Sequence, residues 1–215
     1  GLILASCLEV TGLARMSVTD MTLTLWLTGC SWCLLGAVLE TPRWWVLAGV
    51  FSGLALLTKG PVGLVLPGGI VLIYSLMVGR FKATFANGWF ALGTLLAVAI
   101  AAPWYMAAGA ENGMAFWNAL VFHNVDRFST VVSGHKQFPF FYPVVLIAGF
   151  LPWSVYLPAT LAQWLPQFKT FWQRLRQNQA SGSAELTAYL ALYCLVWAVG
   201  VYGFFEASQT KLLTY

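Results

Sequence analysis

Three polar stretches between long apolar runs contain the residues that could do chemistry. In the first stretch, Arg15 is followed five positions later by Asp20. Ser17 or Thr19 could cap a helix that begins there, and a carboxylate at position 20 would suit the positive end of the helix dipole. In the alternative interpretation, Asp20 is a carboxylate at the rim of a site and Arg15 is a ligand for an anion. Both interpretations predict that a helix begins near residue 20.

The second polar stretch runs from Asn118 to Phe128 and contains His123, Asp126 and Arg127. On a helix, His123 and Arg127 would share a face because they are four positions apart. The guanidinium of Arg127 presents a planar fork of donors that suits a phosphate. A local ion pair at the surface, between Asp126 and either neighbour, would explain the same residues without any function.

A metal site can also be drawn from this region. His123, Asp126 and His135 are of the types that bind a divalent cation, but their spacing matches no standard ligand pattern. We therefore keep a divalent metal on these three residues only as a hypothesis and establish no cofactor from the sequence.

The third polar stretch follows Glu206 and contains Lys211. A hydrated helix end, with the Lys211 side chain reaching water, would explain it. Pro103 lies in an apolar run two positions before Tyr105, and Pro152 lies in a later apolar run. A proline there removes a backbone hydrogen bond and kinks the helix, and such a kink opens space for a lipid or a ligand.

The elements that position these residues must be membrane helices. The chain is 60% hydrophobic and only 8% charged, with a mean hydropathy of +0.76, whereas soluble domains are roughly 25% charged. The apolar runs are long and do not alternate, which favours helices over a barrel. The net charge is +4, but the basic residues are scattered, so we expect no nucleic-acid partner. The fold class we predict is all-α, a polytopic transmembrane helical bundle.

A bilayer core of ~30 Å needs about 20 helical residues. The apolar runs predict the end of a truncated span near 1–13, followed by spans near 19–39, 44–58, 62–78, 89–108, 138–164 and 185–206. Because the chain opens on a glycine and stops within a change from polar to apolar sequence, we interpret the whole of 1–215 as part of a longer protein.

Alternation of these spans assigns the connections to two sides. The connections 40–43, 79–88 and 165–184 carry six basic residues and the others carry five, so we expect the first set to be cytoplasmic. The long loop 109–137 then lies outside. Its interleaved aromatic residues are typical of short surface helices that lie along the membrane. We therefore expect a multi-pass protein of the cell (inner or plasma) membrane with an extracytoplasmic active site.

Lys59 lies with Gly60 and Pro61 in an expected outer turn between two short spans. Gly60 and Pro61 would end one helix and begin the next. In the plain interpretation, the Lys59 side chain reaches water near the negative end of the helix dipole. In the alternative, it faces inward, toward the same outer cavity as Arg127.

Taken in order, these motifs resemble the polytopic membrane glycosyltransferases of the GT-C type, in the bacterial aminoarabinose-transferase-like branch that is related to the protein O-mannosyltransferases. The resemblance covers nearly all 215 residues. It is carried by Ala14-Arg15 with Asp20, Leu57-Thr58-Lys59-Gly60-Pro61, Pro103-Trp104-Tyr105, His123 through Phe128, Gly134-His135, Pro139-Phe140-Phe141-Tyr142, Pro152-Trp153, Ser208, Lys211-Leu212 and Thr214-Tyr215.

The resemblance implies a transferase of the cell envelope that takes a sugar from a polyprenyl phosphate on the extracytoplasmic face. The acceptor would be a hydroxyl or phosphate group of a lipid, glycan or protein. Cations would stabilise the polyprenyl phosphate as it leaves, and a carboxylate would deprotonate or orient the acceptor. The implied cations are Arg127, Lys59 and Lys211, and Arg15 is a secondary candidate. His123 and Tyr105 are further substrate-binding candidates.

The implied carboxylate is a departure from the family pattern. The main acidic motif of the family lies before the region matched here, so Asp20 resembles a second, supporting carboxylate, and we expect the fragment alone to be inactive.

A transporter, flippase or ligase of lipid-linked saccharides is the alternative function. It would place charges within the spans, where only Glu9 lies in an apolar run. A membrane scaffold would leave the outer basic residues unexplained.

Overall fold

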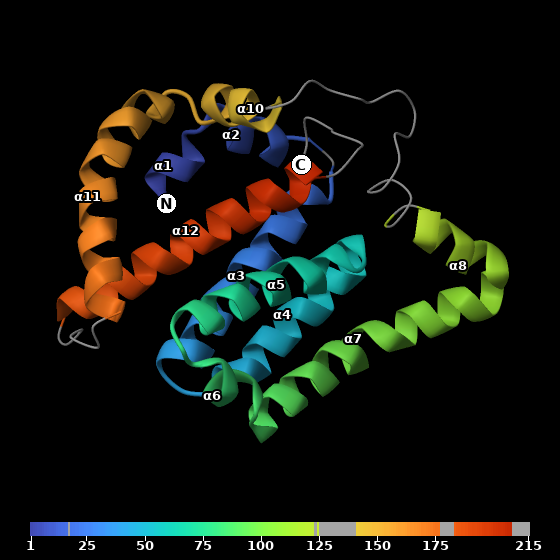
Figure 1. Cartoon of the computed structure of the whole chain (residues 1–215). Helices are drawn as coiled ribbons and strands as arrows, with labels where there is room; N and C mark the ends of the chain where they lie inside the picture. Colours follow the sequence, from blue (N-terminus) through green and yellow to red (C-terminus); the bar gives the residue numbers. More distant parts are fainter. Residues whose placement is uncertain (17, 123, 125–140, 177–182, 208–215) are drawn as a thin grey trace. The chain divides into compact units, whose positions relative to one another are not determined.

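The computed structural model describes residues 1–16, 18–122, 124, 141–176 and 183–207. All the elements of this part of the chain are helical (Figure 1). The helices are α1 (Leu2–Ala5), α2 (Leu8–Ala14), α3 (Asp20–Leu39), α4 (Trp44–Lys59), α5 (Val62–Met77), α6 (Phe81–Phe85), α7 (Gly88–Asn112), α8 (Met114–Val121), α10 (Phe141–Gly149), the 3₁₀ helix η2 (Trp153–Tyr156), α11 (Leu157–Arg176) and α12 (Ser183–Ala207).

The chain divides into two compact units. One contains residues 18–137 and 200–215, and the other contains residues 1–17 and 138–199. The boundary falls within α12, whose residues from 200 onward group with the first of these units. The candidate site lies in the unit of 18–137 and 200–215.

Helices α3, α4, α5 and α7 form the body of this unit (Figure 1). Short connections at 40–43 and 60–61 reverse the chain between α3 and α4 and between α4 and α5. As a result, the start of α3, the end of α4 and the start of α5 lie at one end of the unit. The ends of α3 and α5 and the start of α4 lie at the other end, as the expected alternation of spans requires.

Glycines allow α4 and α7 to pack backbone against backbone. A Cβ atom added at Gly49 would lie 2.1 Å from the carbonyl oxygen of Gly93, and one added at Gly93 would lie 2.2 Å from the carbonyl oxygen of Trp45. Gly53 lies one turn further along α4, opposite Ala97 and Ile100. Small residues at this spacing allow helices in lipid to approach closely, where van der Waals packing stabilises them.

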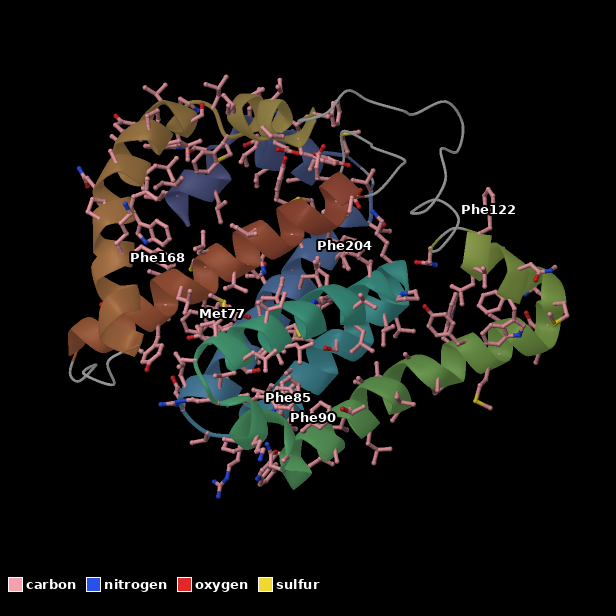
Figure 2. The ribbon with its side chains drawn as sticks, in the orientation of Figure 1. Met77, Phe85, Phe90, Phe122, Phe168 and Phe204 are labelled. Carbon is pink, nitrogen blue, oxygen red and sulfur yellow. The ribbon has the colours of Figure 1, made fainter. Side chains whose placement is uncertain are left out.

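The end of the unit opposite the candidate site is closed by α6. Arg80 donates a hydrogen bond to the carbonyl oxygen of Val38 (3.0 Å) and so caps the last turn of α3. The indole N–H of Trp45 donates to the carbonyl oxygen of Thr84 (2.9 Å). Phe85 and Phe90 pack edge to face, with ring centroids 5.3 Å apart, at the corner between α6 and α7 (Figure 2). This end is therefore fixed by capping, hydrogen bonding and aromatic packing.

The other unit contains α1, α2, α10, η2, α11 and the larger part of α12. The backbone N–H of Leu8 donates to the carbonyl oxygen of Leu151 (3.1 Å), and the indole of Trp153 donates to the hydroxyl of Ser6 (2.8 Å). These bonds join the N-terminal helices to the segment between α10 and η2. In place of the end of one span at 1–13, the structure has the two short helices α1 and α2.

The expected span 138–164 is not one continuous helix. Within its described part, α10 and the helix that begins at Trp153 are bent by 110° relative to each other, with Gly149 and Pro152 at the break. Proline lacks the N–H that would continue the helix, which explains the interruption. The following helix α11 extends to Arg176 and therefore replaces the first part of the expected connection 165–184 with helix.

Three helices of the described chain are long and apolar enough to cross a membrane, namely α3, α7 and residues Leu186–Ala207 of α12. They coincide with the expected spans 19–39, 89–108 and 185–206. Helices α4 and α5 are apolar but have 16 residues each, which gives each a length of about 24 Å. The composition and these helices identify a polytopic helical membrane protein.

Candidate functional site

An ion pair between Asp20 and Lys59 is the centre of the candidate site. Asp20 is the first residue of α3 and Lys59 is the last residue of α4. Because α3 and α4 are antiparallel neighbours, their ends meet, and the Nζ atom of Lys59 contacts the Oδ1 atom of Asp20. The side chains are 26% exposed for Lys59 and 16% exposed for Asp20. The pair is therefore mostly shielded from solvent.

The two helix ends favour this arrangement of charges. A carboxylate is stabilised in the first turn of a helix and an ammonium in the last turn, because the macrodipole places positive charge at the N-terminus and negative charge at the C-terminus. The expected capping by Thr19 is not observed, since its side chain makes no capping hydrogen bond to α3. Asp20 interacts with the cation at the neighbouring helix end. Ser17 lies outside the described residues.

The turn that follows Lys59 requires glycine. Gly60 has a φ of +76°, in the region that side chains disfavour. A Cβ atom at this position would also lie 3.1 Å from the Oδ1 atom of Asn124. The Asn124 side chain therefore fills the space beside Gly60, and its Nδ2 atom donates to the carbonyl oxygen of Leu120 (2.8 Å). Asn124, three residues after the end of α8, thus lies beside the glycine that follows Lys59.

Tyr105 contacts the same turn from α7. Its hydroxyl donates a hydrogen bond to the carbonyl oxygen of Leu56 (3.0 Å), one turn before Lys59. Its ring packs against Trp104 and Phe116, with ring centroids 5.0 and 6.1 Å away. After the bend at Gly113, α8 turns back toward α7 (Figure 1), which is how Phe116 reaches these rings.

The other predicted site residues fall into two groups. Arg15 follows α2, is exposed and belongs to the unit of residues 1–17 and 138–199. The remaining candidates, His123, Asp126, Arg127, His135 and Lys211, lie outside the described residues, and the metal hypothesis lies there with them. Among the residues that the structure describes, no group of three or more His, Cys, Asp or Glu side chains could hold a metal ion.

Of the predicted residues, the structure brings together Asp20 and Lys59, and the hydroxyl of Tyr105 on α7 bonds to the helix turn that carries Lys59. Sequence reasoning treated Asp20 and Lys59 separately and missed their pairing, although alternation of the spans already assigned both to one side. It also missed Asn124 beside Gly60 and the hydrogen bond from Tyr105 to Leu56. No pattern in the sequence marks these contacts, because both join helices that are far apart along the chain.

Comparison with known proteins shows which proteins the chain resembles. Residues 1–106 match the family described as dolichyl-phosphate-mannose-protein mannosyltransferase. The chain is 31% identical to the undecaprenyl phosphate-alpha-4-amino-4-deoxy-L-arabinose arabinosyl transferase of Erwinia tasmaniensis, over 98% of this chain and 35% of the relative. It is 32% identical to a transferase of the same name from Sodalis glossinidius, over 100% of this chain and 36% of the relative. The chain thus spans about a third of the length of the curated relatives it matches.

Solved structures agree with this similarity. The crystal structure of ArnT from Cupriavidus metallidurans bound to undecaprenyl phosphate superposes with a TM-score of 0.76 at 24% identity, over 100% of this chain and 37% of ArnT. The structure of the same protein in the apo state gives a TM-score of 0.67 at 25% identity, over 100% of this chain and 35% of ArnT.

The fold and the matches together define the class: the chain is similar to the polytopic membrane glycosyltransferases of the GT-C type. Within that type, its similarity is to the aminoarabinose-transferase-like branch, as its motifs predicted.

Proposed function

We propose that the protein is an integral membrane glycosyltransferase that moves a sugar from a polyprenyl phosphate to a lipid, glycan or protein acceptor. The names of the similar proteins support undecaprenyl phosphate as the carrier and 4-amino-4-deoxy-L-arabinose as the sugar. The single observation that carries the proposal is the Asp20–Lys59 pair at an end of the bundle, in a chain that is similar throughout to these transferases.

The proposed reaction requires a cation at the leaving phosphate. The acceptor oxygen forms a bond to the anomeric carbon, the bond from that carbon to the phosphate oxygen breaks, and the electron pair leaves with the polyprenyl phosphate. The acceptor proton goes to a carboxylate. A preorganised ammonium beside the phosphate oxygens stabilises the charge that develops there. Lys59 has this role in our proposal, together with Arg127 and Lys211, and Arg15 is a secondary candidate for it.

Asp20 supports Lys59 in this scheme and does not act as the main base. Its Oδ1 atom is engaged by the ammonium of Lys59, which fixes the direction in which the ammonium points. A positioned carboxylate can also orient an acceptor hydroxyl with its second oxygen. The family resemblance assigns the main base to an acidic motif that precedes the region matched here.

We further propose that the Asp20–Lys59 end of the bundle is extracytoplasmic, in a cell (inner or plasma) membrane. The opposite end of the same unit carries Arg43, Arg80 and Lys82 close to the helix ends, as is typical of cytoplasmic connections. At the Lys59 end, α8 exposes Met114, Trp117 and Val121. These residues suit a short helix that lies along the membrane surface.

No resident cofactor is part of the proposed mechanism. A divalent metal on His123, Asp126 and His135 stays a hypothesis, and a transfer assay with and without EDTA tests it. Undiminished transfer in EDTA would remove the metal from the scheme.

A transfer assay tests the proposed function. The native protein is reconstituted in liposomes with undecaprenyl phosphate-linked 4-amino-4-deoxy-L-arabinose, labelled in the sugar, and with a lipid extract of the cell envelope. Transfer of the label to a second lipid, with release of undecaprenyl phosphate, is expected. Movement of intact donor across the bilayer without transfer would instead show a flippase. An unchanged donor on its original side, under conditions where the protein is folded, would overturn the choice of this sugar donor.

A further inference from the structure

The carbonyl oxygen of Leu56 is shared by two donors. The backbone N–H of Gly60 donates to it at 2.9 Å and completes the last backbone hydrogen bond of α4. The hydroxyl of Tyr105, on α7, donates to the same oxygen at 3.0 Å. A carbonyl oxygen has two lone pairs and can accept both bonds. The final turn of α4 is therefore fastened to α7 by a side chain that lies 49 residues away in sequence.

Lys59 is carried by that fastened turn. It follows Leu56 by three positions and is the last residue of α4. The last carbonyl groups of a helix lack partners within the helix, and the final turn frays easily for that reason. A hydrogen bond from a neighbouring helix restrains this fraying. It therefore restrains the backbone from which the Lys59 side chain extends toward Asp20.

The ring of Tyr105 has a packing role that is separate from its hydroxyl. It makes an edge-to-face contact with Trp104 and a tilted contact with Phe116. Phenylalanine at position 105 would keep both ring contacts and remove only the bond to Leu56. The chain therefore permits a substitution that isolates the hydroxyl.

We infer that Tyr105 is a positioning residue for Lys59: its hydroxyl holds the last turn of α4 so that the ammonium of Lys59 stays where the phosphate of the carrier lipid binds. This inference rests on the proposed function, because it needs a phosphate at Lys59. It differs from the sequence-based expectation that Tyr105 binds substrate directly. Tyr105 acts on the phosphate through Lys59 only.

The experiment is a double-mutant cycle on the binding of undecaprenyl phosphate to the native protein. The four proteins are wild type, Tyr105→Phe, Lys59→Ala and the double variant, with Tyr202→Phe as a control. Tyr202 is partly exposed in α12. Loss of one neutral hydrogen bond corresponds to roughly a fivefold weaker affinity. We expect Tyr105→Phe to weaken binding about fivefold in wild type but not in the Lys59→Ala background.

The outcomes separate the inference from the function that underlies it. If Tyr105→Phe weakens binding equally in both backgrounds, Tyr105 touches the lipid directly or acts through general stability, and the positioning role is wrong. If Lys59→Ala weakens binding and Tyr105→Phe does not, the inference also fails while the role of Lys59 stands. If Lys59→Ala binds undecaprenyl phosphate as wild type does, the proposed role of Lys59 fails and the inference fails with it.

Discussion

Lys59 at the end of α4 forms an ion pair with Asp20 at the start of α3, and both side chains are largely withdrawn from solvent. The pair joins two helix ends that lie 39 residues apart in sequence. Each charge is the counter-ion of the other, so neither is left alone at the edge of an apolar bundle, where an isolated charge is unfavourable. This relationship gives Lys59 a structural partner at the end of α4.

Removal of one charge should affect stability and activity differently. Asp20→Asn removes the carboxylate that pairs with Lys59, and we expect a loss of about 1–2 kcal/mol in the free energy of unfolding. The double variant Asp20→Asn/Lys59→Met removes both charges of the pair, so stability should return. Its transfer activity should stay low because the ammonium of Lys59 is absent. Thermal unfolding in detergent and the transfer assay measure the two quantities, and recovery of activity in the double variant would contradict the proposed role of Lys59.

The close packing of α4 on α7 should not tolerate even one added methyl group. In Gly93→Ala the new Cβ atom would meet the backbone of Trp45, and overpacking of this kind is destabilising by about 1–3 kcal/mol.

Gly69→Ala is the matched control for this substitution. No atom lies within 4 Å of a Cβ added at Gly69 in α5, and alanine favours a helix by about 0.5–1 kcal/mol over glycine. Thermal unfolding should therefore show a lower melting temperature for Gly93→Ala only. Equal melting temperatures would show that α4 and α7 are less closely packed than described.

The sidedness of the bundle can be measured with single cysteines. The native Cys194 is exposed and is first replaced by alanine. A membrane-impermeant maleimide should then label Glu111→Cys, at the Lys59 end of α7, in intact cells. Lys82→Cys in α6 should react only after permeabilisation. The reverse pattern would show that the Lys59 end faces the cytoplasm and would contradict an extracytoplasmic transfer reaction.

Arg127 gives a test that depends on the sequence resemblance alone. Arg127→Ala should abolish transfer from the polyprenyl-phosphate sugar and leave membrane insertion and the melting temperature unchanged. Arg127→Lys keeps the charge but loses the planar fork of donors, so we expect partial activity. Wild-type activity in Arg127→Ala would remove this residue from the set of phosphate ligands.

The fold was predictable where hydrophobicity alone decides it. The runs that become α3, α4, α5, α7 and α12 are nearly uninterrupted, and polar residues or Gly-Pro pairs mark their ends. A kink at Pro152 was expected, but a break of 110° was not, because proline is tolerated within many membrane helices and the sequence gives no bend angle. The polar residues of α11 made a loop the simpler prediction, although they lie on an amphipathic helix.

Of the candidate site, the residue types were predictable and the contacts were not. Asp20 and Lys59 were recognised because charged residues are rare in this chain and lie at the ends of its apolar runs. Their pairing depends on which helices are neighbours, and this is decided by contacts such as Gly49 against Gly93. The hydrogen bond from Tyr105 to Leu56 depends on the same packing, because it joins α7 to α4.

The most direct test of the account is the transfer rate of Lys59→Ala with undecaprenyl phosphate-linked 4-amino-4-deoxy-L-arabinose, measured beside Lys82→Ala. Lys82 is an exposed lysine at the opposite end of the same unit. We expect Lys59→Ala to lower the rate about a hundredfold, because a preorganised donor at a developing charge is lost. Its melting temperature should fall by only a few degrees, and Lys82→Ala should transfer at the wild-type rate. A Lys59→Ala protein that transfers the sugar as fast as wild type would contradict the account.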